Sequence, residues 1–187
     1  MNEKRLAVIL PGVGYTCERP LLYYCAKIVK ATGYEVVKIQ YPSMPIKKDL
    51  ATMKEDCQIG LEHLNRVLDP EMIRQYDEIL FVSKSIGTLI GTEYAHQHGL
   101  PCRHILLTPV AQAIHAGDEY VAFHGMADDW VDVHDVKTKC TKTLHLYEGA
   151  NHSLETGDME KDLDILRDVV HKAKEYIVGR DAKNDKD

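Results

Sequence analysis

Short apolar runs bounded by turn residues recur along the whole chain. Runs of this kind are candidates for β-strands. They cover residues 6–10, 35–41, 78–82, 104–108, 120–124 and 143–147. The sequence therefore predicts about six strands.

Three other stretches have the three- and four-residue spacing of apolar positions that is typical of helices. The first covers residues 50–68 and should stop at the Asp-Pro pair that follows it. The second covers residues 86–98 and is followed by Gly99, a common helix terminator. The third covers residues 159–177, with Asp158 as its expected N-cap.

Alternation of strands and helices predicts an α/β fold. Parallel strands need a crossover connection, and the crossover is usually a helix, so we expect a three-layer sandwich around a mostly parallel sheet. The sequence shows no internal repeat, linker or low-complexity block. We therefore expect a single domain over residues 1–179, followed by a polar tail over residues 180–187.

Composition narrows the classes of partner and compartment. A chain of 187 residues with 44% apolar content can form one sizeable core. The net charge is −6 and the basic residues are dispersed, which argues against a nucleic-acid partner. Five cysteines without a CxxC pair indicate free thiols in a reducing compartment. The apolar run at 6–10 is too short for a signal peptide, and no run has membrane length, so we expect a cytoplasmic protein without a membrane partner.

Candidate chemistry lies where three of the strands end. Ser85 follows the strand at 78–82 and immediately precedes a helix. A serine nucleophile needs a histidine base and an orienting acid. Asp128 and His152 follow two later strands, and the carboxyl ends of parallel strands meet at one edge of a sheet. Asp129 is the alternative acid, and a solvated or helix-capping role is the alternative for Asp128 itself.

Four segments resemble motifs of the α/β-hydrolase superfamily. Ser83-Lys84-Ser85-Ile86-Gly87 resembles its nucleophile elbow, G-x-S-x-G, and the chain order Ser, Asp, His matches the order in that superfamily. HGMADDWV and EGANHSL look like its acid and histidine loops, and LAVILPGVGYT looks like its oxyanion-loop strand. The resemblance extends from the first strand to the last helix. Ser83 replaces the first elbow glycine, and the superfamily's first two strands and its lid have no counterpart, which implies a minimal, lid-less α/β-hydrolase fold.

The resemblance implies a serine hydrolase that cleaves a small-molecule carboxylic ester or thioester through an acyl-enzyme. Ser85 would be the nucleophile, His152 the base and Asp128 the acid. The oxyanion would be held by the backbone N–H groups of Val13 and Ile86, with Gly14 as the alternative to Val13. Independently of the resemblance, four loop residues fall near this site and would either line it or serve packing alone: Tyr15, Met44, Met126 and Trp130.

Other functions remain open at this point. Amidases and acyltransferases use the same machinery, and a binding protein could retain the fold without turnover. The histidine pairs His96/His98 and His124/His134 lack a metal-binding pattern such as HExxH, so we expect no metal. The segment PGVGYT has neither the lysine of a phosphate loop nor the spacing of a dinucleotide fold, so we expect no cofactor.

Overall fold

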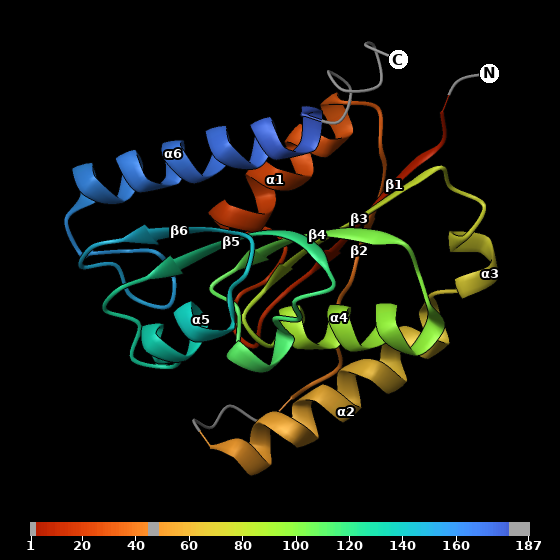
Figure 1. The fold of residues 1–187 in the computed structure, drawn as a ribbon, viewed down its shortest axis with the longest axis horizontal. Helices are drawn as coiled ribbons and strands as arrows, with labels where there is room; N and C mark the ends of the chain where they lie inside the picture. The colour runs from red at the N-terminus through yellow and green to blue at the C-terminus, as the bar shows by residue number, and fades with distance from the viewer. Residues whose placement is uncertain (1–2, 45–48, 180–187) are drawn as a thin grey trace.

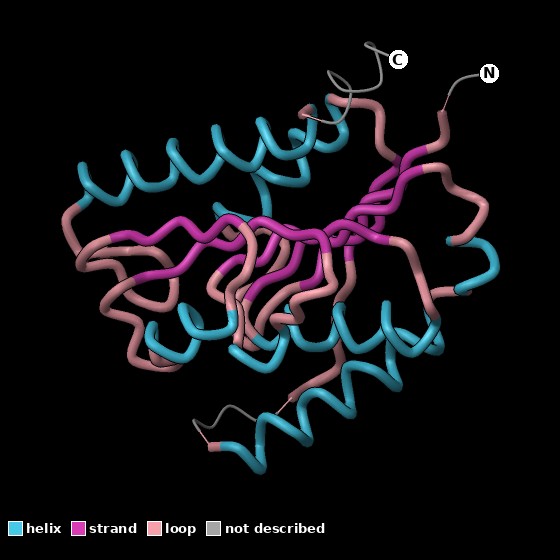
Figure 2. Tube along the Cα trace, viewed as in Figure 1, coloured by secondary structure: helices cyan, strands magenta, loops and turns pink. Residues whose placement is uncertain are grey.

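A six-stranded parallel sheet forms the centre of the structure, with helices on both faces (Figures 1 and 2). The computed structural model describes residues 3–44 and 49–179, so the predicted tail at 180–187 lies outside the described residues. The strand order is β2-β1-β3-β4-β5-β6. The strands are β1 (Arg5–Leu10), β2 (Glu35–Lys38), β3 (Glu78–Lys84), β4 (Cys102–Leu107), β5 (Glu119–Gly125) and β6 (Thr143–Tyr147).

All six predicted strands are confirmed, and their bounds differ by two or more residues at the end of β2, at the end of β3 and at the start of β4, which begins at Cys102 rather than at residue 104. β2 ends at Lys38 rather than at residue 41, because the chain leaves β1 after Ile39 N–H has bonded the carbonyl of Ile9. β3 continues two residues beyond its predicted end, because residues 83 and 84 still pair with β4. A fully buried lysine thus ends the central strand.

The helices divide between the two faces of the sheet. In Figure 1, α1 and α6 cover one face, while α2, α4 and α5 lie on the other. The helices are α1 (Pro20–Ala31), α2 (Leu50–Val67), α3 (Pro70–Ile73), α4 (Ile86–His98), α5 (Val133–Lys139) and α6 (Met159–Val178). The three predicted helices correspond to α2, α4 and α6, and Asp158 caps α6 as expected.

The sequence prediction missed α1, α3 and α5. The amphipathic pattern of α1 was readable, because Leu21, Leu22, Cys25, Ala26 and Val29 all face the core and Pro20 occupies its first turn. The other two helices have four and seven residues, too few for a periodic pattern to be distinguished.

Both faces of the sheet are buried, and the residues of β1 show how the two cores are divided. Ala7 and Ile9 pack in the cluster that includes α1 and α6. Leu6, Val8 and Leu10 point the other way, into the cluster with α2 and α4. Alternation along a strand therefore supplies apolar side chains to both layers, as in other sheets covered on both faces.

The connections reverse direction between β1 and β3. The chain passes from β1 through α1 to β2 at the edge, whereas from β3 it passes through α4 to β4 on the other side. At such a switch point the loops after the two central strands diverge and leave a crevice at the carboxyl edge of the sheet. Residues 11–14 and Ser85 follow β1 and β3, so both lie at this crevice.

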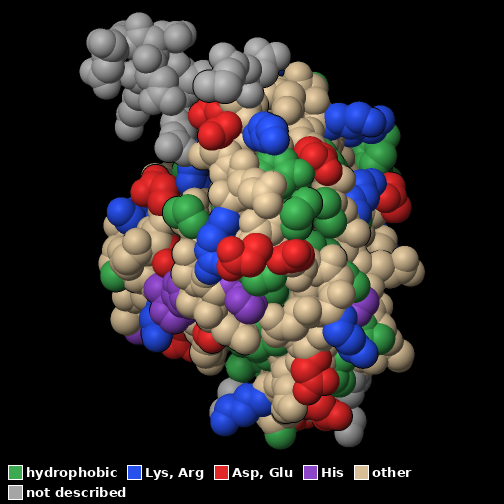
Figure 3. All heavy atoms as spheres, turned by 90° about the vertical axis from the view of Figure 1, so that its right-hand side faces the viewer, with side chains coloured by type: hydrophobic (Ala, Val, Ile, Leu, Met, Phe, Trp, Pro, Cys, Tyr) green, Lys and Arg blue, Asp and Glu red, His purple; other side chains and the backbone are tan. Residues whose placement is uncertain are grey.

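The surface charges and the state of the cysteines can be compared with what the composition predicts. On the face that Figure 3 shows, which is the right-hand side of Figure 1, acidic and basic side chains are intermixed. All five cysteines are free thiols. Among the described residues, no helix combines the length and the apolar character needed to cross a membrane.

We predict that Leu64→Ala lowers the free energy of unfolding by about 2–5 kcal/mol, because it leaves a cavity in the core under α2. Leu64 is 0% exposed. Val67→Ala, one turn later on the same helix at a position that is 51% exposed, should cost less than about 0.5 kcal/mol. Urea denaturation of both variants measures the difference. Equal losses of unfolding free energy in the two variants would show that α2 does not cover this core.

Candidate active site

Ser85 occupies a strained backbone conformation between β3 and α4. Its φ is 56° and its ψ −127°, a region that residues with a side chain rarely adopt. The backbone is held there by neighbours on both sides. Its N–H donates to the Leu107 carbonyl at 3.0 Å, and its own carbonyl accepts from Thr88 N–H at 2.9 Å and Thr88 Oγ1 at 2.6 Å. This turn directs the hydroxyl away from the sheet.

Glycines allow the loop after β1 to approach this turn. A Cβ on Gly87 would lie 2.4 Å from the carbonyl oxygen of Pro11, and a Cβ on Gly12 would lie 3.1 Å from Ser85 Cβ. The first turn of α4 therefore presses directly against the end of β1, where only glycine fits. Ser83 is small enough for its place, fully buried with its hydroxyl donating to the Ile105 carbonyl at 3.4 Å.

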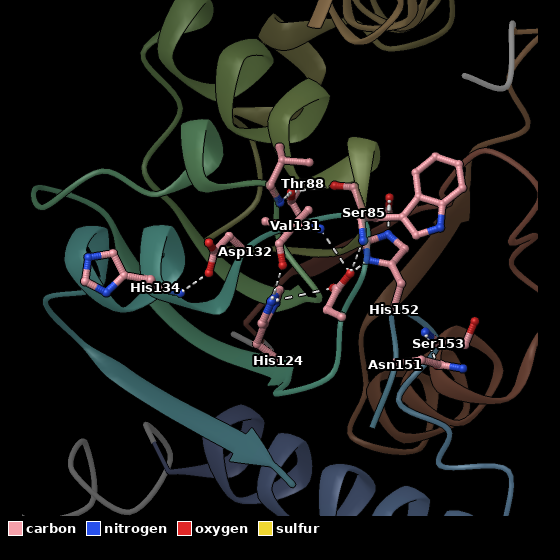
Figure 4. A network of polar contacts seen from close by, with 12 residues as sticks. Ser85, Thr88, His124, Val131, Asp132, His134, Asn151, His152 and Ser153 are labelled. Atoms are coloured by element: carbon pink, nitrogen blue, oxygen red, sulfur yellow. Dashed lines mark hydrogen bonds and ion pairs between the residues drawn. The ribbon is translucent and has the colours of Figure 1, made fainter. Parts of the chain in front are cut away.

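Three side chains from three different loops form one hydrogen-bonded chain. His152 Nε2 lies 2.7 Å from Ser85 Oγ, and His152 Nδ1 lies 2.7 Å from Asp128 Oδ2. Figure 4 shows His152 beside Ser85. The two distances place the imidazole ring between the hydroxyl and the carboxylate. The structure thus brings together the serine, histidine and aspartate that the sequence analysis selected.

The carboxylate that contacts His152 belongs to Asp128 rather than to its neighbours. Its side chain is 0% exposed, and its Oδ1 accepts from the backbone N–H groups of Trp130 at 2.8 Å and Val131 at 3.0 Å. Asp129 is exposed at the surface. Asp132 caps α5 by accepting from His134 N–H at 2.8 Å. The helix-capping alternative therefore belongs to Asp132.

Burial and hydrogen bonding set the charges of Asp128 and His152. Burial opposes ionisation of Asp128, but its hydrogen bonds from His152, Val131 and Trp130 outweigh burial, so the pKa of this carboxyl is lowered. Burial also lowers the pKa of His152 below its usual 6.5, with Lys84 acting in the same direction and Asp128 and Asp129 against it. At neutral pH the pair is therefore an ionised carboxylate and a neutral imidazole, which can accept a proton.

Unused backbone N–H groups surround Ser85. The N–H of Ile86 begins α4 and so has no acceptor within the helix. Gly12 and Tyr15 exchange two hydrogen bonds of 3.1 and 3.2 Å, which close a tight turn around Val13 and Gly14. Within residues 3–44 and 49–179, the N–H groups of Val13, Gly14 and Ile86 donate to no acceptor. Val13 and Gly14 thus remain alternatives.

A cavity of about 630 Å³ opens beside the β1 loop. Its walls come from residues 11–14 and 16–18 on one side and residues 38–44 on the other. Of the residues expected to line the site, Met44 lines this cavity, and Trp130 stacks on the His152 ring at a centroid distance of 5.9 Å. Met126 is exposed, whereas Tyr15 is buried.

Two buried residues next to the site were missed by the sequence analysis. Lys84 is 2% exposed and donates from Nζ to the backbone carbonyl of His152 at 2.8 Å. His124, considered only as half of a metal pair, is 0% exposed, with Nε2 3.3 Å from the Val131 carbonyl and 3.5 Å from Asp128 Oδ2. The signal for Lys84 was its charge at the end of an apolar run, immediately before the serine.

Three of the four histidines weighed as metal ligands have other partners for their side chains, His124 among them as described above. His96 lies 2.8 Å from Asp118, and His98 lies 2.7 Å from Asn65. In the described part of the chain, no group of three or more His, Cys, Asp or Glu side chains has the geometry to hold a metal ion.

We predict that His152 titrates below pH 6.5 and that Asp128→Asn lowers its pKa further. The reason is that the carboxylate hydrogen bond and charge both favour the protonated imidazole. Asp129→Asn should lower the pKa less, because Asp129 acts through charge alone. An NMR titration of the imidazole resonances, with His152→Ala to identify the signal, measures both effects. A larger shift in Asp129→Asn would transfer the role of acid to that residue.

Comparison with known proteins identifies the fold. No protein-family model matches the sequence, and a comparison with curated proteins gave no match. Solved structures do match over nearly the whole chain. Est1E from Butyrivibrio proteoclasticus, with ferulic acid bound, has a TM-score of 0.71 at 13% identity over 96% of this chain and 90% of its own.

Two further structures agree. XC6422 from Xanthomonas campestris, described as a serine hydrolase without a lid, has a TM-score of 0.57 at 16% identity, over 96% of this chain and 84% of its own. The sugar hydrolase YeeB from Lactococcus lactis has a TM-score of 0.62 at 15% identity, over 98% of this chain and 92% of its own. The chain therefore has the α/β-hydrolase fold, in a minimal form without a lid.

Proposed function

We propose that the protein is a serine hydrolase that cleaves a carboxylic ester or thioester through an acyl-enzyme. The observation that carries this proposal is the hydrogen-bonded chain from Ser85 Oγ through His152 to Asp128, at 2.7 Å on each side of the imidazole. The fold adds support, because its structural neighbours include Est1E and a lid-less serine hydrolase.

Acylation begins with proton transfer. Neutral His152 takes the Ser85 hydroxyl proton at Nε2 while Oγ attacks the carbonyl carbon of the substrate. Asp128 holds the other ring nitrogen as a donor and stabilises the imidazolium. When the tetrahedral intermediate collapses, the leaving alcohol or thiol takes the proton from His152 and the acyl group stays on Ser85.

Deacylation repeats these steps with water. His152 removes a proton from a water molecule, the hydroxide attacks the acyl carbon, and the carboxylic acid leaves as Ser85 regains its proton. Both tetrahedral intermediates carry an oxyanion. The N–H of Ile86 and that of Val13 or Gly14 are its donors, and the α4 dipole adds positive potential at the same place.

The cavity beside the β1 loop is our candidate for the acyl-binding site, because Gly12 and Val13 in its wall belong to the loop that approaches Ser85. Val13 and Met44 give its wall apolar surface next to the loop that presses on Ser85. On the other side of the site, Trp130 stacks on the His152 ring. Trp130 is 46% exposed and provides a flat apolar surface beside that ring. In a bound ester, one of the two groups, acyl or leaving, would then extend toward the cavity wall and the other toward Trp130.

We predict that a fluorophosphonate probe labels the protein at Ser85 and that Ser85→Ala abolishes labelling.

His152→Ala should lower the turnover of p-nitrophenyl acetate by a factor on the order of 10⁴ while leaving the melting temperature nearly unchanged, because it removes the base rather than core packing. Ser153→Ala in the same loop is the control and should stay close to wild type. A folded wild-type protein that is neither labelled nor active would indicate a binding protein instead of a hydrolase.

A second prediction concerns the donors to the oxyanion. Gly87→Ala would place a methyl group 2.4 Å from the Pro11 carbonyl, so the β1 loop must shift away from Ser85. We expect kcat to fall at least tenfold with a smaller change in KM, since the lost contact forms in the transition state. Gly91→Ala on the same helix meets side chains rather than the β1 loop backbone, Leu10 Cδ1 at 2.7 Å and Phe81 Cδ2 at 3.3 Å, and should affect stability more than kcat. Equal kcat values for the two variants would contradict the proposed oxyanion loop.

A further inference from the structure

Lys84 is an unusual side chain for the place it occupies. It ends the central strand β3 and is among the largest fully buried side chains of the described residues. Burying an ammonium group is costly unless it is paired. Yet in the described part of the chain no carboxylate lies within 4.0 Å of Lys84. Its contacts are the carbonyl of His152, 2.8 Å from Nζ, and the ring of Tyr15, whose centroid is 5.0 Å away.

These contacts connect the two loops that must meet in catalysis. Lys84 immediately precedes Ser85, and its acceptor is the backbone of His152. Among the described residues, hydrogen bonds between segments 83–87 and 148–156 are limited to this one and the Ser85–His152 contact itself. The remaining hydrogen bonds of the histidine loop are internal or lead to the end of β6, to α6 through Thr156 and Asp162, or to the β5 loop, as with Ala127 N–H to the Ala150 carbonyl at 2.9 Å.

We propose that Lys84 is a positioning residue for the hydrolase reaction, which holds the backbone of His152 at the distance that lets its ring reach Ser85. This inference rests on the proposed function. A core position that served packing alone would be filled at lower cost by Met or Leu, which have similar volume and no charge to desolvate. The lysine stands where its amine can tie the backbone of His152 to the strand that precedes Ser85.

Its charge has a second effect on the base. The titratable groups that face His152 and Lys84 are Asp128, Asp129 and His124 from β5 and its loop, Glu155 from the histidine loop, and Tyr15 from the β1 loop. Burial lowers the pKa of Lys84 to about 7. Lys84 is thus protonated over the lower range in which His152 titrates, and it disfavours a second positive charge on the imidazole. Removing Lys84 must therefore raise the pKa of His152.

The test compares Lys84→Met with wild type. The second-order rate of inactivation by a fluorophosphonate is measured against pH, because this rate reports the Ser85–His152 pair without knowledge of the natural substrate. We expect the rate at its high-pH plateau to fall at least tenfold and its midpoint to move to higher pH. The melting temperature should be equal or higher, because a buried charge has been replaced by a thioether. Lys161→Met, at a side chain 72% exposed, is the matched control and should reproduce wild type.

Two further measurements distinguish a failure of the inference about Lys84 from a failure of the proposed hydrolase function. NMR titration of His152 in Lys84→Met tests the coupling without any reaction, and an upward shift of its pKa is the expected result. Lys84→Leu serves the same purpose should Lys84→Met not fold. A wild-type protein that resists labelling counts against the hydrolase, whereas the titration still decides whether Lys84 acts on His152. An inactivation rate within twofold of wild type, with the His152 pKa unchanged, overturns the inference.

Discussion

The strained turn at Ser85 is the constraint on which the rest of the site depends. A positive φ at a residue with a side chain costs on the order of 1–3 kcal/mol and persists only where the surroundings fix it. Here β4 accepts the Ser85 N–H, Thr88 binds its carbonyl, and the lack of a side chain on Gly87 lets the β1 loop close on the turn. The strain is therefore balanced by the central sheet, and the hydroxyl stands where three strand ends meet.

The electrostatics of the site follow from that placement. Because the serine stands over a buried sheet, its partners must also be largely removed from water. Asp128 stays ionised in this environment because two backbone N–H groups and the imidazole donate to it. Burial keeps His152 neutral, and Lys84 adds to the effect. A dry environment thus gives His152 and Asp128 the charges that the proposed function requires, and it makes each hydrogen bond in the chain stronger than it would be in water.

The sequence predicted the strands, the helices α2, α4 and α6 and the three site side chains, because each depends on local patterns and on where parallel strands end. It did not reach the features that arise from contacts distant in sequence. Lys84 and the histidine loop are 68 positions apart, so nothing local marks their hydrogen bond. Asp128 and Asp129 are equivalent in sequence, and the β5 turn alone decides which carboxylate faces inward. The end of β2 depends on where the chain departs from β1, which its apolar run does not encode.

The lack of a lid changes what must hold the site together. In a lidded hydrolase, closure over the substrate can help to assemble the catalytic groups. Here the base arrives on a loop between β6 and α6, and that loop has to be in place before the substrate binds. Its internal hydrogen bonds give it shape, but shape alone does not fix its distance from β3. In the role proposed for Lys84, its buried amine reaches from the strand to the loop backbone and supplies that distance. The stability given up by burying Lys84 is then the cost of an active site that is preorganised without a cover.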